Sequence, residues 1–248
     1  MTSRTNAFIA SFLLVGSTIG VQAADLPARV YTKAASVQVY DWSGIYIGAN
    51  GGWGSSHSCW FLTNDVGTPR PNDPEGCHNA SGGTAGGQIG YRWQRSSWVF
   101  GLEAQGNWAD FNGSNLSPIG GLINRSKLDT YGLFTGQVGY AWDSVLLYAK
   151  GGAAVARNRY AGFELQDGVD IDRGSETRWG GTVGIGGEYA ISRSVSFGLE
   201  YDHLFMGNRD TTLIATGLSM GAAGTNTRGE RISQDVDTVT ARLNFHFN

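Results

Sequence analysis

Two stretches of strict alternation, joined by a short polar turn, constrain the fold of this chain more than any other feature. From Trp179 to Tyr189 every second residue is apolar, aromatic or glycine, and the residues between them are polar, small or charged. The turn 191–194 leads into a second stretch, 195–203, with the same pattern. A period of two is the pattern of a β-strand with two different faces. The two stretches therefore predict an antiparallel hairpin with about ten residues in each strand.

The chemistry of the two faces indicates which side of this hairpin meets water. The apolar face carries large aromatic rings near both ends, and the other face carries charged residues such as Arg178, Glu188 and Glu200. A soluble eight-stranded barrel such as a lipocalin has an apolar inside and a polar outside, which is the reverse. Strands that are apolar outside, polar inside and bordered by aromatic rings are typical of a transmembrane β-barrel.

The same alternation recurs along the chain and predicts eight strands, the first beginning near Trp42 and the last reaching Phe247. The predicted short turns are 94–97, 143–144 and 191–194, and the predicted long loops are 55–80, 110–127, 157–176 and 206–234. Long loops at one end and tight turns at the other are typical of outer-membrane barrels. Strands of about 11 residues tilted by about 40° span roughly 28 Å, close to the hydrocarbon thickness of a membrane. The predicted fold is all-β, an eight-stranded antiparallel up-and-down transmembrane β-barrel.

The N-terminus has the composition of an export signal. Arg4, an apolar run over 7–21 and small residues before Ala24 predict a signal peptide over 1–23. Residues 24–41 are then expected to form an N-terminal periplasmic arm, and 42–248 the outer-membrane β-barrel domain. Removing the signal peptide takes away one basic residue and no acidic one, which leaves a net charge of about −4. That balance argues against a nucleic-acid partner, because such a partner requires a basic patch.

Four short motifs occur in order along the mature chain: ADLP at 24–27, DWSGIYIG at 41–48, GIGGEY at 184–189 and FGLEY at 197–201. Their order and spacing resemble the Omp25/Omp31-like outer-membrane β-barrel proteins of α-proteobacteria, a porin family. The resemblance covers essentially the whole mature chain, and it implies a Gram-negative outer membrane with lipid and lipopolysaccharide as neighbours. It also implies a signal for the barrel-assembly machinery in the last strand, at Phe245 and Phe247. The family commonly ends on Phe, whereas Asn248 follows here.

Charged residues at the inward positions of the predicted strands form the first candidate site. They are Arg92, Glu103, Asp129, Lys150, Arg178, Glu188, Glu200, Asp202 and Arg242. Eight strands enclose only enough room for side chains, and a buried ion without a partner is costly. We therefore expect a salt-bridge network that fills the lumen. The alternative is a narrow gated pore, whose wall would also need polar residues.

The two cysteines, Cys59 and Cys77, fall in the first predicted loop. In an exported chain two cysteines usually pair, so we expect a disulfide. His57 and His78 flank them, and the four side chains together offer the ligands of a zinc site as the alternative. We prefer the disulfide and predict no metal site.

Aromatic residues at the ends of the predicted strands are expected to form a girdle at the membrane interfaces. They are Trp93, Trp98, Trp108, Trp142, Trp179 and Tyr189. The predicted loops carry basic residues that could bind anionic lipopolysaccharide or could be ordinary solvated charges. They are Arg125, Lys127, Arg157, Arg159, Arg209, Arg228 and Arg231.

The sequence contains no motif that indicates a catalytic site. No nucleophile motif surrounds a serine, and the glycine-rich stretches lack the Lys-Ser/Thr of a phosphate-binding loop. We therefore expect no enzyme and no cofactor, but a structural role in envelope integrity together with surface display. The alternatives are a small-solute porin of low conductance and a loop-mediated adhesin or haem receptor. Peptidoglycan-linked or host surface partners and the oligomeric state stay open.

Overall fold

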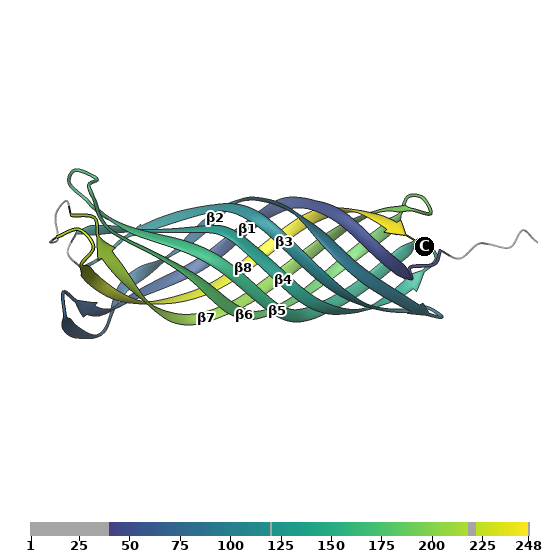
Figure 1. Ribbon diagram of the computed structural model, residues 1–248, viewed down its shortest axis with the longest axis horizontal. Helices are drawn as coiled ribbons and strands as arrows, with labels where there is room; N and C mark the ends of the chain where they lie inside the picture. Colours follow the sequence, from purple (N-terminus) through teal and green to yellow (C-terminus); the bar gives the residue numbers. More distant parts are fainter. Residues whose placement is uncertain (1–39, 120, 218–221, 248) are drawn as a thin grey trace, which may run out of the picture. The chain divides into compact units, whose positions relative to one another are not determined.

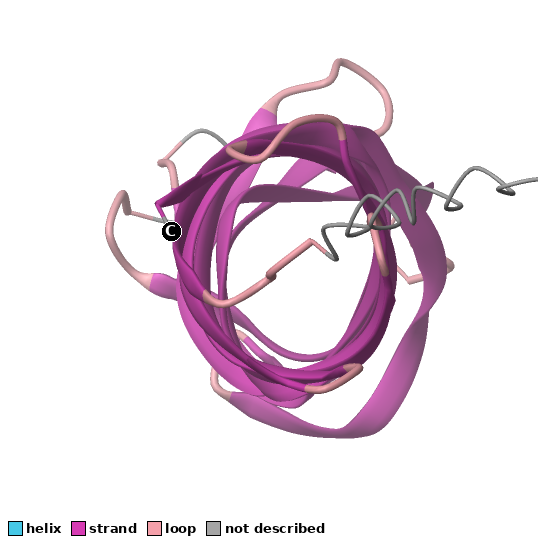
Figure 2. Ribbon diagram, turned by 90° about the vertical axis from the view of Figure 1, so that its right-hand side faces the viewer, coloured by secondary structure: helices cyan, strands magenta, loops and turns pink. Residues whose placement is uncertain are grey.

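The computed structural model describes residues 40–119, 121–217 and 222–247. They form eight strands: β1 Gly44–Asp65, β2 Thr68–Arg95, β3 Trp98–Leu116, β4 Leu122–Trp142, β5 Val145–Glu164, β6 Asp170–Ala190, β7 Val195–Ala215 and β8 Asn226–Phe247. Each strand pairs antiparallel with the next, and β8 pairs with β1 to close the ring (Figures 1 and 2). The predicted eight-stranded antiparallel barrel is confirmed.

Two of the predicted segments lie outside the described residues: the signal peptide, and the periplasmic arm up to residue 39. Among the residues that are described, no helix is long and apolar enough to cross a membrane.

The predicted long loops are wrong for most of their length, because the strands continue through them. β1 and β2 are joined by only two residues, Val66 and Gly67, whose φ angles of 45° and 86° are those of a type I′ turn. The other connections at this end are 117–121, 165–169 and 216–225. Polar outward residues, prolines and glycines gave these segments the composition of loops, although their backbones pair as sheet.

Outward apolar side chains occupy only part of each strand. We call this part the membrane band; it comprises residues 45–53, 85–93, 98–108, 132–142, 145–155, 179–189, 195–205 and 239–247. These segments of nine to eleven residues match the strand length that the sequence predicts. Beyond them every strand continues toward the four connections that replace the predicted loops, and we call this part the extension. Ten further residues at a tilt of about 40° add roughly 25 Å to the barrel.

β-Bulges decide which face several residues occupy. Leu128 pairs with Asn158 and Thr130 with Arg157, so Asp129 is an extra residue in β4 without a partner in β5. An extra residue reverses the alternation of side chains beyond it. Inward residues of β4 are therefore odd-numbered in the membrane band and even-numbered in the extension.

Candidate functional site: the filled lumen

The centre of the lumen holds a tight cluster of ion pairs, which we call the central network. Lys150 on β5 places its Nζ 2.7 Å from Oε1 of Glu200, 3.1 Å from Oδ1 of Asp202 and 3.5 Å from Oε1 of Glu103. Arg242 on β8 donates to the carboxylates of both Glu103 and Glu200. Four strands, β3, β5, β7 and β8, thus contribute to one buried cluster that crosses the barrel from wall to wall.

Two tyrosines complete the central network. Tyr46 donates from its hydroxyl to Oε2 of Glu103 over 2.7 Å, and Tyr148 donates to Oε2 of Glu200 over 2.7 Å. Each ring lies across a glycine of the neighbouring strand. A Cβ at Gly90 would come within 2.4 Å of Tyr46, and one at Gly186 within 2.4 Å of Tyr148. The glycines therefore make room for the rings inside a narrow lumen.

Arg92 forms a second buried pair nearer the short turns. Its Nη2 donates to Oε2 of Glu188 over 2.8 Å, and the two side chains are 0% and 1% exposed. The guanidinium also lies over the ring of Tyr46, 4.3 Å from its centroid, and faces the rings of Tyr148 and Trp42 at 5.6 and 5.8 Å. These aromatic faces stabilise the cation where hydrogen-bond partners are few.

Trp42 closes the lumen at the short-turn end. Its ring is fully buried although it precedes β1, and its Nε1 donates to the carbonyl of Asp143 over 3.2 Å. It packs against Tyr40 and His246. Trp42, which was expected to begin the first strand, therefore precedes that strand and fills the short-turn end of the lumen.

An apolar layer lies on the other side of the central network, at the border between the membrane band and the extension. Its largest members are Tyr131, Phe111, Leu128, Leu133, Leu204 and Met206, all of which point inward and are buried. The expectation of a uniformly polar lumen is therefore incomplete. An ion crossing the barrel would meet charges held in pairs and then this largely apolar layer, in which the hydroxyl of Tyr131 accepts a hydrogen bond from Thr84.

The lumen positions predicted from the sequence differ in their outcome. Seven of the nine residues belong to the central network or the Arg92–Glu188 pair: Arg92, Glu103, Lys150, Glu188, Glu200, Asp202 and Arg242. Arg178 also faces inward, but it lies in the extension, where it pairs with Glu176 and donates to the hydroxyl of Tyr160 over 3.0 Å. The prediction for Asp129 is wrong. The bulge at this residue turns its side chain to the outer surface, where it pairs with Arg159.

Sequence reasoning missed a buried cluster in the extension, because its members fall in the predicted loops. Nε of Arg228 donates to Oδ2 of Asp172 over 2.8 Å, and its Nη1 lies 3.2 Å from Oε2 of Glu75 and 3.4 Å from Oε1 of Glu230. Arg228 is therefore no solvated loop cation. The even-numbered inward positions of β8 continue without interruption from Arg242 back to Arg228, and this continuity was the signal available in the sequence.

Glu230 is the residue of this cluster whose carboxylate lacks hydrogen-bond donors among the described residues. Neither of its carboxylate oxygens accepts a hydrogen bond from any residue that the structure describes. Burial, and then the nearby carboxylate of Glu75, raise the pKa of Glu230 to about 8. Burial opposes the charge of Arg228, but its hydrogen bond to Asp172 and the surrounding carboxylates raise the pKa of Arg228. The cluster thus holds one cation, Arg228, among three acids, and burial raises the pKa of one of these acids, Glu230, to about 8.

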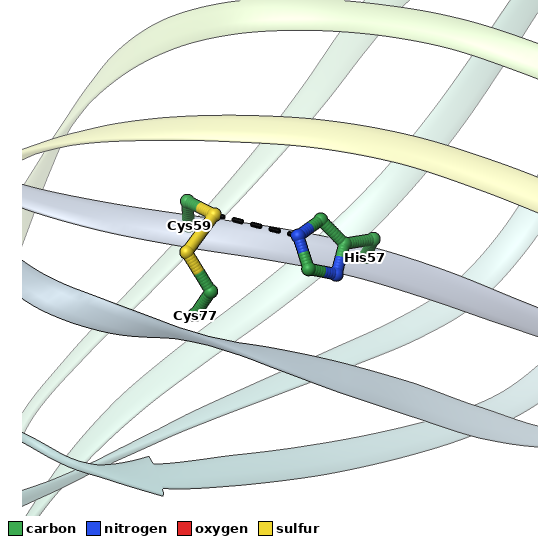
Figure 3. Close-up of side chains that lie close together, drawn as sticks. All are labelled: His57, Cys59 and Cys77. Carbon is green, nitrogen blue, oxygen red and sulfur yellow. Dashed lines mark hydrogen bonds between the residues drawn. A yellow bond between two sulfur atoms is a disulfide. The ribbon is translucent and has the colours of Figure 1, made fainter.

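Cys59 and Cys77 are joined by a disulfide between paired positions of β1 and β2. Figure 3 shows His57 beside it, with Nε2 3.5 Å from Sγ of Cys59. His78 points to the opposite face, into the lumen, where its Nδ1 lies 2.8 Å from Oδ1 of Asn115. The four side chains that would make the zinc site therefore do not converge, and both thiols are used by the disulfide.

The predicted girdle residues all lie on the outer surface. Trp93, Trp98, Trp142 and Tyr189 are at the short-turn edge of the membrane band, and Trp108 and Trp179 are at the opposite edge. Trp53 and Phe205 join the second group. Phe245 and Phe247 also point outward, with ring centroids 5.0 Å apart, on the strand that closes the ring.

Comparison with known proteins agrees with this architecture. The model of the outer membrane protein beta-barrel domain family matches residues 11–247. The 31 kDa outer-membrane immunogenic protein of Brucella melitensis is 30% identical over 189 residues, which are 71% of this chain and 76% of that protein. The 22 kDa outer membrane protein of Rhizobium leguminosarum is 30% identical over 138 residues, 55% of this chain and 59% of that protein.

Among solved structures, the outer membrane protein OprG of Pseudomonas aeruginosa has a similar fold, with a TM-score of 0.50 and 15% sequence identity. The match covers 84% of this chain and 98% of OprG. The predicted family and the predicted location in the outer membrane are both confirmed. The chain belongs to the outer membrane protein beta-barrel domain family and is an outer-membrane β-barrel protein of the Omp25/Omp31 type.

Proposed function

We propose that this protein is a closed, non-catalytic barrel that strengthens the outer membrane and displays its extension at the cell surface. The observation that carries the proposal is the filled lumen. Where the barrel crosses the membrane, ion pairs and hydrogen bonds link side chains from opposite walls, and these side chains are almost completely buried. A conducting path would require these partners to separate inside a low-dielectric environment, which is costly for each ion.

The apolar layer and Trp42 support the same proposal, because each lies across the route that a solute would follow. The extension supports the display role, since it presents paired sheet rather than lipid-facing residues beyond the membrane band. The Brucella relative carries the word immunogenic in its name, which agrees with a surface that antibodies reach.

Single-channel conductance in a planar bilayer tests the closed lumen. The refolded chain, with β-structure verified by circular dichroism, should give no discrete current steps. A general-diffusion porin added to the same bilayer shows that the membrane can report channels. Repeated steps from the verified barrel would contradict the closed lumen.

A deletion strain tests the envelope role separately. Loss of the protein should make cells more sensitive to detergent, and the wild-type gene should restore resistance. Unchanged sensitivity in the deletion strain would rule out the structural role even if the barrel proved closed.

A further inference from the structure

The geometry points to a binding site for the phosphorylated headgroup of lipopolysaccharide on the outer wall of β4, β5 and β6, directly above the membrane band. This inference uses the location in the outer membrane and does not depend on whether the lumen is closed. We call the site the cationic wall; its basic residues are Arg125, Lys127, Arg157, Arg159 and Arg173.

Strand register places these cations on three consecutive outward rows. The row nearest the membrane is Thr130, Arg157 and Thr177 in register across the three strands. The next row is Lys127, Arg159 and Ser175, and the third is Arg125, Ala161 and Arg173. The row below them, Gly132, Val155 and Trp179, already belongs to the membrane band. The phosphates of an outer-leaflet lipid lie at this depth, immediately above the hydrocarbon.

The charge of the cationic wall is only partly compensated. Three of its cations pair with acids, Lys127 with Asp110, Arg159 with Asp129 and Arg173 with Asp170. Arg125 and Arg157 make no ion pair with any residue that the structure describes. Five cations against three acids leave two positive charges, on a protein whose formal net charge is −3.

The shape of the wall suits a headgroup. A groove of about 560 Å³ opens on this face, and its lining includes Arg125, Lys127, Arg159 and Arg173 together with Phe163 and Ile214. Arg125 holds its guanidinium 4.5 Å from the ring centroid of Phe163, and both residues line the groove. Arginine binds phosphate through two parallel N–H donors, and water exclusion by the apolar lining strengthens such contacts.

Below the groove the wall is smooth and apolar. Gly132 and Gly181 lie next to Phe134 and Trp179, whose rings stack with centroids 6.4 Å apart. An acyl chain can lie against this surface while the phosphates meet the arginines above it.

The other side of the barrel has the opposite character at the same depth. The first outward positions above the membrane band on β8 are Asp237 and Asp235, and on β1 they are Ser55 and His57. An anionic lipid is therefore favoured on one wall and disfavoured on the other. This difference separates a site from the general attraction of any barrel for lipid.

Native mass spectrometry of the refolded full chain in detergent tests the site, with bisphosphorylated lipid A as the probe. The double variant Arg125→Gln/Arg157→Gln should weaken lipid A binding by about tenfold or more, because two charge-assisted contacts are lost. The matched control, Arg70→Gln/Arg231→Gln, removes the same two charges from exposed ion pairs elsewhere on the extension. It should bind as the wild type does.

Three outcomes would overturn the inference. Equal weakening in both double variants would indicate nonspecific charge attraction. Equal binding of dephosphorylated lipid A would indicate apolar contact alone. Displacement of lipid A by inorganic phosphate at concentrations near those of the lipid would assign the cations to a free phosphate rather than to the headgroup. Circular dichroism confirms that each variant is folded before binding is compared.

Discussion

Glu188 shows how much one lumen residue contributes to this barrel. Its carboxylate accepts hydrogen bonds from Arg92 over 2.8 Å, from Asn244 over 3.0 Å and from Ser196. Replacement by alanine leaves the guanidinium of Arg92 buried without its anion, and breaking a buried pair in this way costs about 3–5 kcal/mol. We expect Glu188→Ala to lower the free energy of unfolding by this amount, measured by urea titration in detergent.

The control for Glu188 is an acid in a solvated pair. Asp210 pairs with Arg231 on the exposed surface of the extension, so Asp210→Ala should change the free energy of unfolding by less than about 1 kcal/mol. Equal urea midpoints for the wild type and Glu188→Ala would refute the structural role of the Arg92–Glu188 pair.

The raised pKa of Glu230 predicts that the stability of the folded barrel depends on pH. Because its pKa in the folded barrel is about 8, well above the ordinary value of a glutamate, the folded state binds more protons than the unfolded chain between these two values. Stability should therefore be highest below the ordinary pKa and should fall as pH rises toward 8. We expect the melting temperature of the wild type to fall relative to that of Glu230→Gln between about pH 5 and about pH 9.

The comparison with Glu230→Gln isolates one group, since both proteins share all other titrating residues. Melting temperatures that stay parallel across the pH range would show that the carboxylate of Glu230 is not responsible.

At the scale of single elements, the tip of the β1–β2 hairpin depends on its disulfide. Beyond Cys59 and Cys77 the pairing shifts register twice, and β2 contains Pro69, Pro71 and Pro74, none of which can donate to the ladder. The bridge spans a sequence separation of 18, and closing a loop of this size contributes about 3 kcal/mol in the chain-entropy model. The variant Cys59→Ser/Cys77→Ser should therefore open locally at the tip.

Limited proteolysis followed by mass analysis measures this opening. Cleavage between residues 60 and 76 should accelerate in the serine variant, while the β3–β4 hairpin, which has no disulfide, is cut at an unchanged rate. Reduced wild type should behave as the variant does. Identical cleavage of oxidised wild type and variant would mean that sheet pairing alone holds the tip.

Elements were predictable from the sequence wherever their two faces differ strongly. The membrane band has apolar outward and polar inward residues, so its strands and short turns are visible in the pattern. In the extension both faces carry polar residues, as in Ser55 to Ser58, and the contrast that reveals a strand disappears. Bulges are harder still, because the extra residue at Asp129 depends on how β4 pairs with β5 and leaves no local signal.

At the scale of the whole molecule, the pattern of a single strand shows which of its side chains point inward. It does not show which other inward side chains they contact. The alternation placed Arg92, Lys150 and Glu200 inside the barrel, since each lies on a strand with a clear outward apolar face. Which of them meet depends on the stagger of eight strands around the ring, and Arg92 reaches Glu188 across 96 positions of the chain. The same stagger separates Arg178 from the central network and brings Arg228 to Glu75.

The extension also has an evolutionary consequence. In the proposed display role, the surface offered to antibodies is a pleated wall, in which outward-facing and inward-facing residues alternate. Outward side chains other than those of the cationic wall can then change under selection by antibodies, whereas inward ones such as Asp172 and Arg228 are bound into a packed interior. Escape mutations in relatives should therefore fall on alternate residues of each strand, and antibodies should recognise the folded wall far better than any linear peptide cut from it.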